Sequence, residues 1–73
     1  MHTQIVMDAT GDTRHYFDAD DQAAVAEAER RFAELTVVGY IAAKRTGSGT
    51  ADLIRSFDPN VKETLFIPRL IGG

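Results

Sequence analysis

The sequence ends in two glycines, Gly72 and Gly73, directly after the apolar and basic run TLFIPRLI. Glycine has no side chain and leaves its backbone dihedral angles free, so a carboxyl end made of two glycines can enter a narrow enzyme channel. A terminal carboxyl group has a pKa of about 3.5, so it is ionised at neutral pH and can act as a nucleophile. These last residues are the first candidates for chemistry.

Three other groups of residues could serve catalysis or ligand binding, but each lacks part of the required pattern. DADDQA, which starts at Asp18, has neither the sixth-position glycine nor the late glutamate of a calcium loop. KRTGSGT, which starts at Lys44, lacks the lysine and hydroxyl that end a phosphate-binding loop. His15 could meet Asp12 or Asp18 across a turn, but there is no cysteine and no serine in a nucleophile elbow. We therefore expect helix caps, a hairpin turn and a surface histidine, and not an enzyme.

The composition is that of one small domain with an apolar core. The sequence has 73 residues, of which 44% are hydrophobic, and a formal net charge of −3. That acidic balance disfavours nucleic-acid binding, although Arg14, Arg45 and Arg55 could gather into a weak basic patch. No apolar run approaches the ~20 residues of a membrane span and no signal peptide is evident, so we expect a cytoplasmic protein without a membrane partner. With two histidines and no cysteine, we expect no metal site and no cofactor.

The start of the sequence predicts a β-hairpin. Ile5–Met7 forms a short strand, DATGDT supplies turn residues, and Arg14–Phe17 forms the returning strand. Because side chains alternate along a strand, His15 and Tyr16 should lie on opposite faces of the sheet.

The segment FDADDQAAVAEAERRFAELT predicts one amphipathic helix. Asp18 or Asp20 is expected to cap it, and Asp21 adds negative charge to the first turn, where the helix dipole favours it. Glu27 and Arg31 have the spacing of an (i, i+4) ion pair. The apolar stripe has helical spacing and comprises Val25, Ala28, Phe32 and Leu35.

The second half of the sequence predicts three further strands. Two of them form a hairpin around TGSG, and FDPN forms a turn after it. The last strand covers Glu63–Ile67, and Pro68 should interrupt its pairing just beyond. Alternation separates Phe66 from Leu65 and Ile67, but it does not say which of the two faces meets the helix.

This order of elements, followed by a diglycine end, resembles the ubiquitin-like β-grasp family. The last stretch is similar to the end of ubiquitin, with the pairs Thr64-Leu65 and Arg69-Leu70, one further residue and two glycines. One residue fewer separates the two pairs here. FIPRLIGG is also similar to the ends of the bacterial sulfur carriers of molybdopterin and thiamine synthesis, which often carry a proline shortly before the glycines. The order of elements matches over the whole chain, whereas residue similarity is confined to TLFIPRLIGG.

The resemblance implies an α+β fold of the β-grasp type. In this fold a four- to five-stranded mixed sheet has one amphipathic helix packed across it. The strand Glu63–Ile67 should then run parallel to Ile5–Met7 and lie beside it. Residues 1–67 would form this single domain, and residues 68–73 would form an exposed tail.

The resemblance also implies a protein modifier or a sulfur carrier. In such proteins an ATP-dependent activating enzyme adenylates the C-terminal carboxylate, here that of Gly73 behind Gly72, which then becomes a thioester or thiocarboxylate. Target proteins or a sulfur acceptor would be further partners. Arg69 and Leu70 would be recognition points on an arm that starts at Pro68 and spans about 20 Å when extended. All catalytic groups and the nucleotide would belong to the partner enzyme.

Some residues depart from the ubiquitin pattern. Pro68 stiffens the arm, and Ile71 stands where ubiquitin has a basic residue, which argues against a ubiquitin-type activating enzyme. Only Lys44 and Lys62 could accept another copy, so polymer chains are not expected. The alternative is a small protein-interaction module whose C-terminus is not activated.

Overall fold

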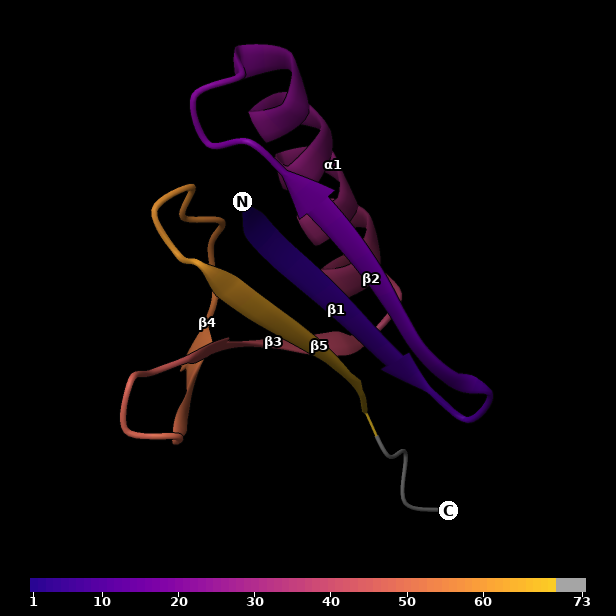
Figure 1. The fold of residues 1–73 in the computed structure, drawn as a ribbon. Coiled ribbons are helices and arrows are strands. Elements are labelled where there is room, and N and C mark those ends of the chain that lie inside the picture. Colours follow the sequence, from indigo (N-terminus) through magenta and orange to yellow (C-terminus); the bar gives the residue numbers. More distant parts are fainter. Residues whose placement is uncertain (70–73) are drawn as a thin grey trace.

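The computed structural model describes residues 1–69, in which one helix packs on a five-stranded mixed sheet (Figure 1). The strand order across the sheet is β2-β1-β5-β3-β4. The predicted α+β fold class is confirmed, and the topology is ubiquitin-like. The elements in chain order are β1 (His2–Asp8), β2 (Gly11–Phe17), α1 (Gln22–Val37), β3 (Tyr40–Arg45), β4 (Ala51–Ile54) and β5 (Glu63–Pro68).

The first and last strands run parallel, side by side, near the middle of the sheet (Figure 1). In this ladder Ile5 lies opposite Leu65, and Val6 lies opposite Phe66. β1 pairs antiparallel with β2 on its other side, and β5 pairs antiparallel with β3. Parallel strands require a long crossover connection, which α1, β3 and β4 supply. The expected pairing of the first and last strands is therefore confirmed.

The core lies between α1 and the sheet face that carries Phe66. Phe66 is fully buried, and its ring meets that of Phe32 edge-on, with 5.6 Å between the ring centroids. Phe57 continues this cluster, since its ring lies 6.0 Å from that of Phe32 and 6.3 Å from that of Phe17. Ala28 is buried as well. The apolar stripe of the helix thus faces the sheet, and Phe66 marks the covered face.

A buried glutamine joins the sheet to the helix. Gln4 of β1 is fully buried, and its Nε2 donates a hydrogen bond of 2.9 Å to the backbone oxygen of Ala28. Its Oε1 accepts a hydrogen bond of 2.8 Å from Nη1 of Arg31. Leaving a buried amide unpaired would cost about 1–3 kcal/mol, so both bonds hold α1 in position over β1. The predicted Glu27–Arg31 pair is wrong, because Arg31 turns to the sheet and Arg30 bonds Glu27 instead.

The cap of α1 also differs from the prediction, because Asp21 occupies it in place of Asp18 or Asp20. The carboxylate of Asp21 accepts hydrogen bonds from the backbone N–H groups of Ala23 and Ala24, at 3.0 and 3.2 Å. Asp18 shapes the turn before the helix: its carboxylate accepts from the N–H of Asp20, and its carbonyl accepts from the N–H of Asp21. This turn delays the start of the helix.

The strands β1, β2 and β5 are longer than predicted. β1 and β2 pair from His2 and Phe17 as far as Asp8 and Gly11, and Gly11 has a φ of +126° that favours glycine. Pro68 does not interrupt the last strand, because β5 includes it, opposite Tyr40 of β3. The ladder to β1 ends at Phe66, so β5 has only one neighbouring strand at Pro68. A proline, which has no N–H to donate, can therefore be accommodated there.

Replacing Phe66 should destabilise the domain far more than replacing its neighbour Ile67. We expect Phe66→Ala to lower the free energy of unfolding by about 3–5 kcal/mol, because it opens a cavity in the closed core. Ile67 is 38% exposed on the other face, so Ile67→Ala should cost only about 1 kcal/mol. Urea denaturation followed by circular dichroism measures both.

Phe66→Leu serves as a milder variant if Phe66→Ala does not fold, and it should still cost more than Ile67→Ala. Equal losses at the two positions would contradict the placement of the core.

Candidate functional site

The predicted site residues follow β5, and only the first of them is described. Arg69 lies directly after Pro68 and is exposed. Leu70, Gly72 and Gly73 lie outside the described residues. Because β5 runs parallel to β1, it brings Arg69 toward the end of the sheet at which β1 turns into β2 (Figure 1).

The sheet face turned away from α1 carries a row of apolar side chains that crosses four strands. Ala43 of β3 lies between Leu53 of β4 and Leu65 of β5, and Leu65 lies next to Ile5 of β1. Ala43, Leu65 and Ile5 are at most 5% exposed, whereas Leu53 at the end of the row is 73% exposed. The sequence could not reveal this row, because it depends on the order of the strands.

A second apolar pair lies beside this row. Ile41 of β3 is opposite Ile67 of β5, and these side chains are 37% and 38% exposed. We refer to Ile41, Leu53 and Ile67, the exposed members, as the helix-free patch. Exposed apolar side chains that gather on one face are typical of surfaces that bind other proteins. The patch includes Ile67 of β5, the strand that leads to Arg69.

His15 lies on the opposite face of the sheet, next to α1. It is half-buried and pairs across the ladder with Gln4, while Tyr16 is exposed on the other face, as predicted. Neither Asp12 nor Asp18 contacts His15 in the structure. Alternation puts Asp12 on the other face of the sheet, and the carboxylate of Asp18 accepts a hydrogen bond within the turn before α1. His15 therefore has neither of the two predicted carboxylates beside it.

The electrostatic surroundings of His15 disfavour its charged form. Burial lowers the pKa of His15, and the nearby positive charge of Arg31 lowers it further. The carboxyl group of Asp8 also has a lowered pKa, chiefly because the Thr10 hydroxyl donates a hydrogen bond to it at 2.6 Å. Over residues 1–69, no three His, Asp or Glu side chains lie close enough together to hold a metal ion.

Arg14 and Arg45, two of the three arginines that could form a basic patch, do not lie on neighbouring strands. Arg14 lies on β2 and Arg45 on β3, and the two strands between them imply a separation of about 14 Å. Arg45 also forms an ion pair with Glu63, with Nε and Oε1 3.5 Å apart. The KRTGSGT segment forms the turn between β3 and β4, as predicted, and its Thr46 N–H bonds the carbonyl of Thr50 at 2.8 Å.

Comparisons with protein-family models, with curated proteins and with solved structures found no match. The link to ubiquitin-like proteins therefore rests on the topology and on the residues of TLFIPRLIGG. In the part of the chain that the structure describes, no helix is long and apolar enough to cross a membrane.

The lowered pKa of His15 predicts how the stability of the folded protein changes with pH. Below the ordinary histidine pKa of 6.5, the unfolded chain takes up a proton at this position before the folded protein does. Stability that is fully present above 6.5 should therefore be lost as the pH falls through the folded pKa of His15. His15→Gln should remove this contribution to the loss of stability at low pH.

Urea midpoints of both proteins between about pH 8 and pH 5 test this prediction. His2 is present in both, so the difference between the curves isolates His15. Asp8 does not contribute to the pH dependence in this range, because its pKa is lowered from 3.8. Two parallel curves would show that the surroundings of His15 do not favour its neutral form.

Proposed function

We propose that this protein is a ubiquitin-like modifier or sulfur carrier whose C-terminal glycine carboxylate is adenylated by a partner enzyme. The observation that carries the proposal is the parallel pairing of β5 with β1. It makes Glu63–Pro68 an inner strand of the sheet, flanked by β1 and β3, and the diglycine sequence follows that strand after only three residues. The same topology and the same ending occur together in ubiquitin-like proteins.

In this mechanism the chain supplies a substrate group and the partner supplies the catalytic groups. The carboxylate of Gly73 attacks the α-phosphate of ATP and displaces pyrophosphate, which leaves an acyl adenylate. A sulfur nucleophile then displaces AMP and forms a thioester or a thiocarboxylate. Transfer to a target amine or to a sulfur acceptor completes the cycle. Gly72 and Gly73 keep the reacting end narrow, and Arg69 and Leu70 are the points at which the enzyme recognises the arm.

The folded domain would act as a docking platform in this reaction. The helix-free patch includes Ile67, two residues before Arg69 in the chain. A partner that binds this face therefore holds the start of the arm in a fixed place. Binding at a distance from the reacting group lowers the entropic barrier of the chemical step.

The helix-free patch favours a second candidate function, a protein-interaction module without an activated C-terminus. Ile41, Leu53 and Ile67 present apolar surface that could bind a partner by itself. In that case Arg69 and the residues after it would contribute nothing to binding of the partner.

Removal of Gly72 and Gly73 tests the first function. Incubated with ATP and an extract of the source organism, the full chain should form an ATP-dependent covalent conjugate or exchange a carboxylate oxygen for sulfur. The chain without the two glycines should do neither, because the activating enzyme acts only on the narrow end. Intact-mass spectrometry measures both products.

A chain with one alanine added after Gly73 is the matched control, because it keeps every native residue but moves the carboxylate. It should also fail to react. ATP-dependent products of equal yield from all three chains would contradict activation at this carboxylate.

Substitution in the helix-free patch tests the second function. Ile41→Asp should weaken partner binding at least about tenfold, since it puts a charge where apolar surface is buried. Val37 at the end of α1 is 84% exposed and lies outside the patch, so Val37→Asp is the control. Pull-down with the wild type and both variants, each with and without the two glycines, measures the effect.

An interaction module should lose its partner with Ile41→Asp and keep it when the glycines are removed. Equal retention of the partner by Ile41→Asp and Val37→Asp would argue against the patch.

A further inference from the structure

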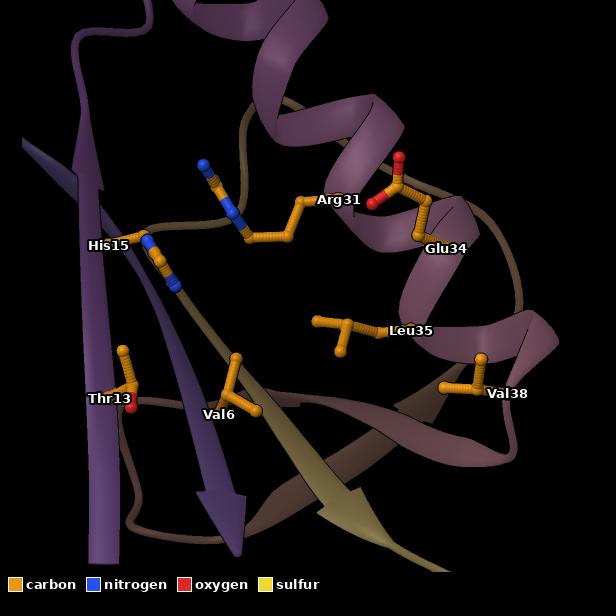
Figure 2. A pocket seen from close by; sticks show the side chains of 7 residues that line it. All are labelled: Val6, Thr13, His15, Arg31, Glu34, Leu35 and Val38. Atoms are coloured by element: carbon orange, nitrogen blue, oxygen red, sulfur yellow. The ribbon is translucent and has the colours of Figure 1, made fainter.

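A second surface feature lies on the helix side of the sheet and has no part in the proposed function. A hollow of about 400 Å³ opens between α1 and the strands β1 and β2 (Figure 2). Its floor is apolar and is formed by Val6 of β1 and Leu35 of α1, and the exposed Val38 stands at its rim. His15 and Arg31 line its opposite end, where the side chain of Arg31 reaches from α1 toward the strands (Figure 2). Small-molecule sites have this size and this combination of apolar walls with few polar groups.

The guanidinium of Arg31 is held in place and keeps most of its donors. Nη1 donates to Oε1 of Gln4 at 2.8 Å, and Gln4 is itself fixed by its bond to Ala28. A guanidinium has five N–H donors, so four remain for other partners. No ion pair joins Arg31 to a carboxylate of residues 1–69. A half-buried positive charge therefore stands beside an apolar floor without a negative partner in the described chain.

The other ionisable groups around the hollow do not cancel this charge. Glu34 borders it, but its carboxylate points away from the floor (Figure 2) and pairs with Arg30, with Oε1 and Nε 3.9 Å apart. His15 offers a ring that faces the side chain of Arg31 across the hollow (Figure 2). One end of the hollow is thus positive and able to donate hydrogen bonds, and the other end is apolar.

We propose that this hollow binds a small carboxylic acid with a short aliphatic body. The carboxylate accepts hydrogen bonds from the free donors of Arg31 and from a ring N–H of His15. The aliphatic body covers Val6, Leu35 and Val38. Arginine suits this role because its planar fork matches the two oxygens of a carboxylate. A bare inorganic anion would satisfy Arg31 but would leave the apolar floor in water.

Titration with 4-methylpentanoate tests the proposal, with 4-methylpentanamide as a neutral ligand of the same shape. Two-dimensional ¹H–¹⁵N NMR should show saturable shifts at Val6, His15 and Leu35 with the acid. The amide should bind at least about tenfold more weakly, because it loses the charge-assisted hydrogen bonds to Arg31. Equal affinities, or no saturation by the acid below about 20 mM, would overturn the proposal.

Two pairs of variants locate the site. Arg31→Gln should weaken binding of the acid at least about tenfold, whereas Arg14→Gln, which changes an exposed arginine on the opposite face of the sheet, should leave binding unchanged. Val38 is 72% exposed at the rim, and Val37 is 84% exposed outside the hollow. Val38→Asp should therefore weaken binding of the acid by charge repulsion, and Val37→Asp should have little effect on binding.

The second pair keeps the test decisive if Arg31→Gln does not fold, because Val38→Asp changes no buried contact. Acid binding that survives both Arg31→Gln and Val38→Asp would place the ligand elsewhere and overturn the proposal.

Discussion

The parallel ladder between β1 and β5 is the contact on which the rest of the structure depends. Strands that run the same way cannot be joined by a tight turn, so the chain between them must leave the sheet and return. It leaves the sheet as α1 and returns as β3 and β4, and the result is a sheet in which β5 has a neighbour on each side. Without this ladder the β1–β2 hairpin would be separate from the strands β5, β3 and β4, and Glu63–Pro68 would be an edge strand.

The ladder also divides the sheet into two faces with different properties. On one face, Phe66 and Gln4 hold the helix, the first by aromatic packing and the second by two hydrogen bonds, of which the one to Ala28 is buried. On the other face, Leu65 and Ile5 are buried, while the helix-free patch is exposed. A polar residue in the core has a further consequence, because Gln4 holds Arg31 at the edge of the hollow beside α1. The same contact that positions the helix therefore positions a charge.

The two proposals use separate parts of this small domain. Activation of the C-terminus requires only that β5 present an arm and that a partner recognise it, and the helix-free patch is continuous with that strand. Carboxylate binding uses the opposite face and depends on Arg31 and an apolar floor. Because no residue is shared, either proposal can fail without affecting the other. Neither requires catalytic groups from the described residues.

The sequence by itself determined the order of the elements, the apolar stripe of α1, the turn at TGSG and the fold class. These follow from helical and strand periodicity and from turn residues, which act over a few positions. Only the tertiary structure decided that Phe66 faces the helix, that Arg31 bonds Gln4 and not Glu27, and that Ile41, Leu53 and Ile67 share one face. Each of these depends on residues far apart in the chain, whose proximity is set by strand order and register. The diglycine could be read directly, whereas the surfaces that would serve it, and the hollow beside α1, exist only once the sheet has formed.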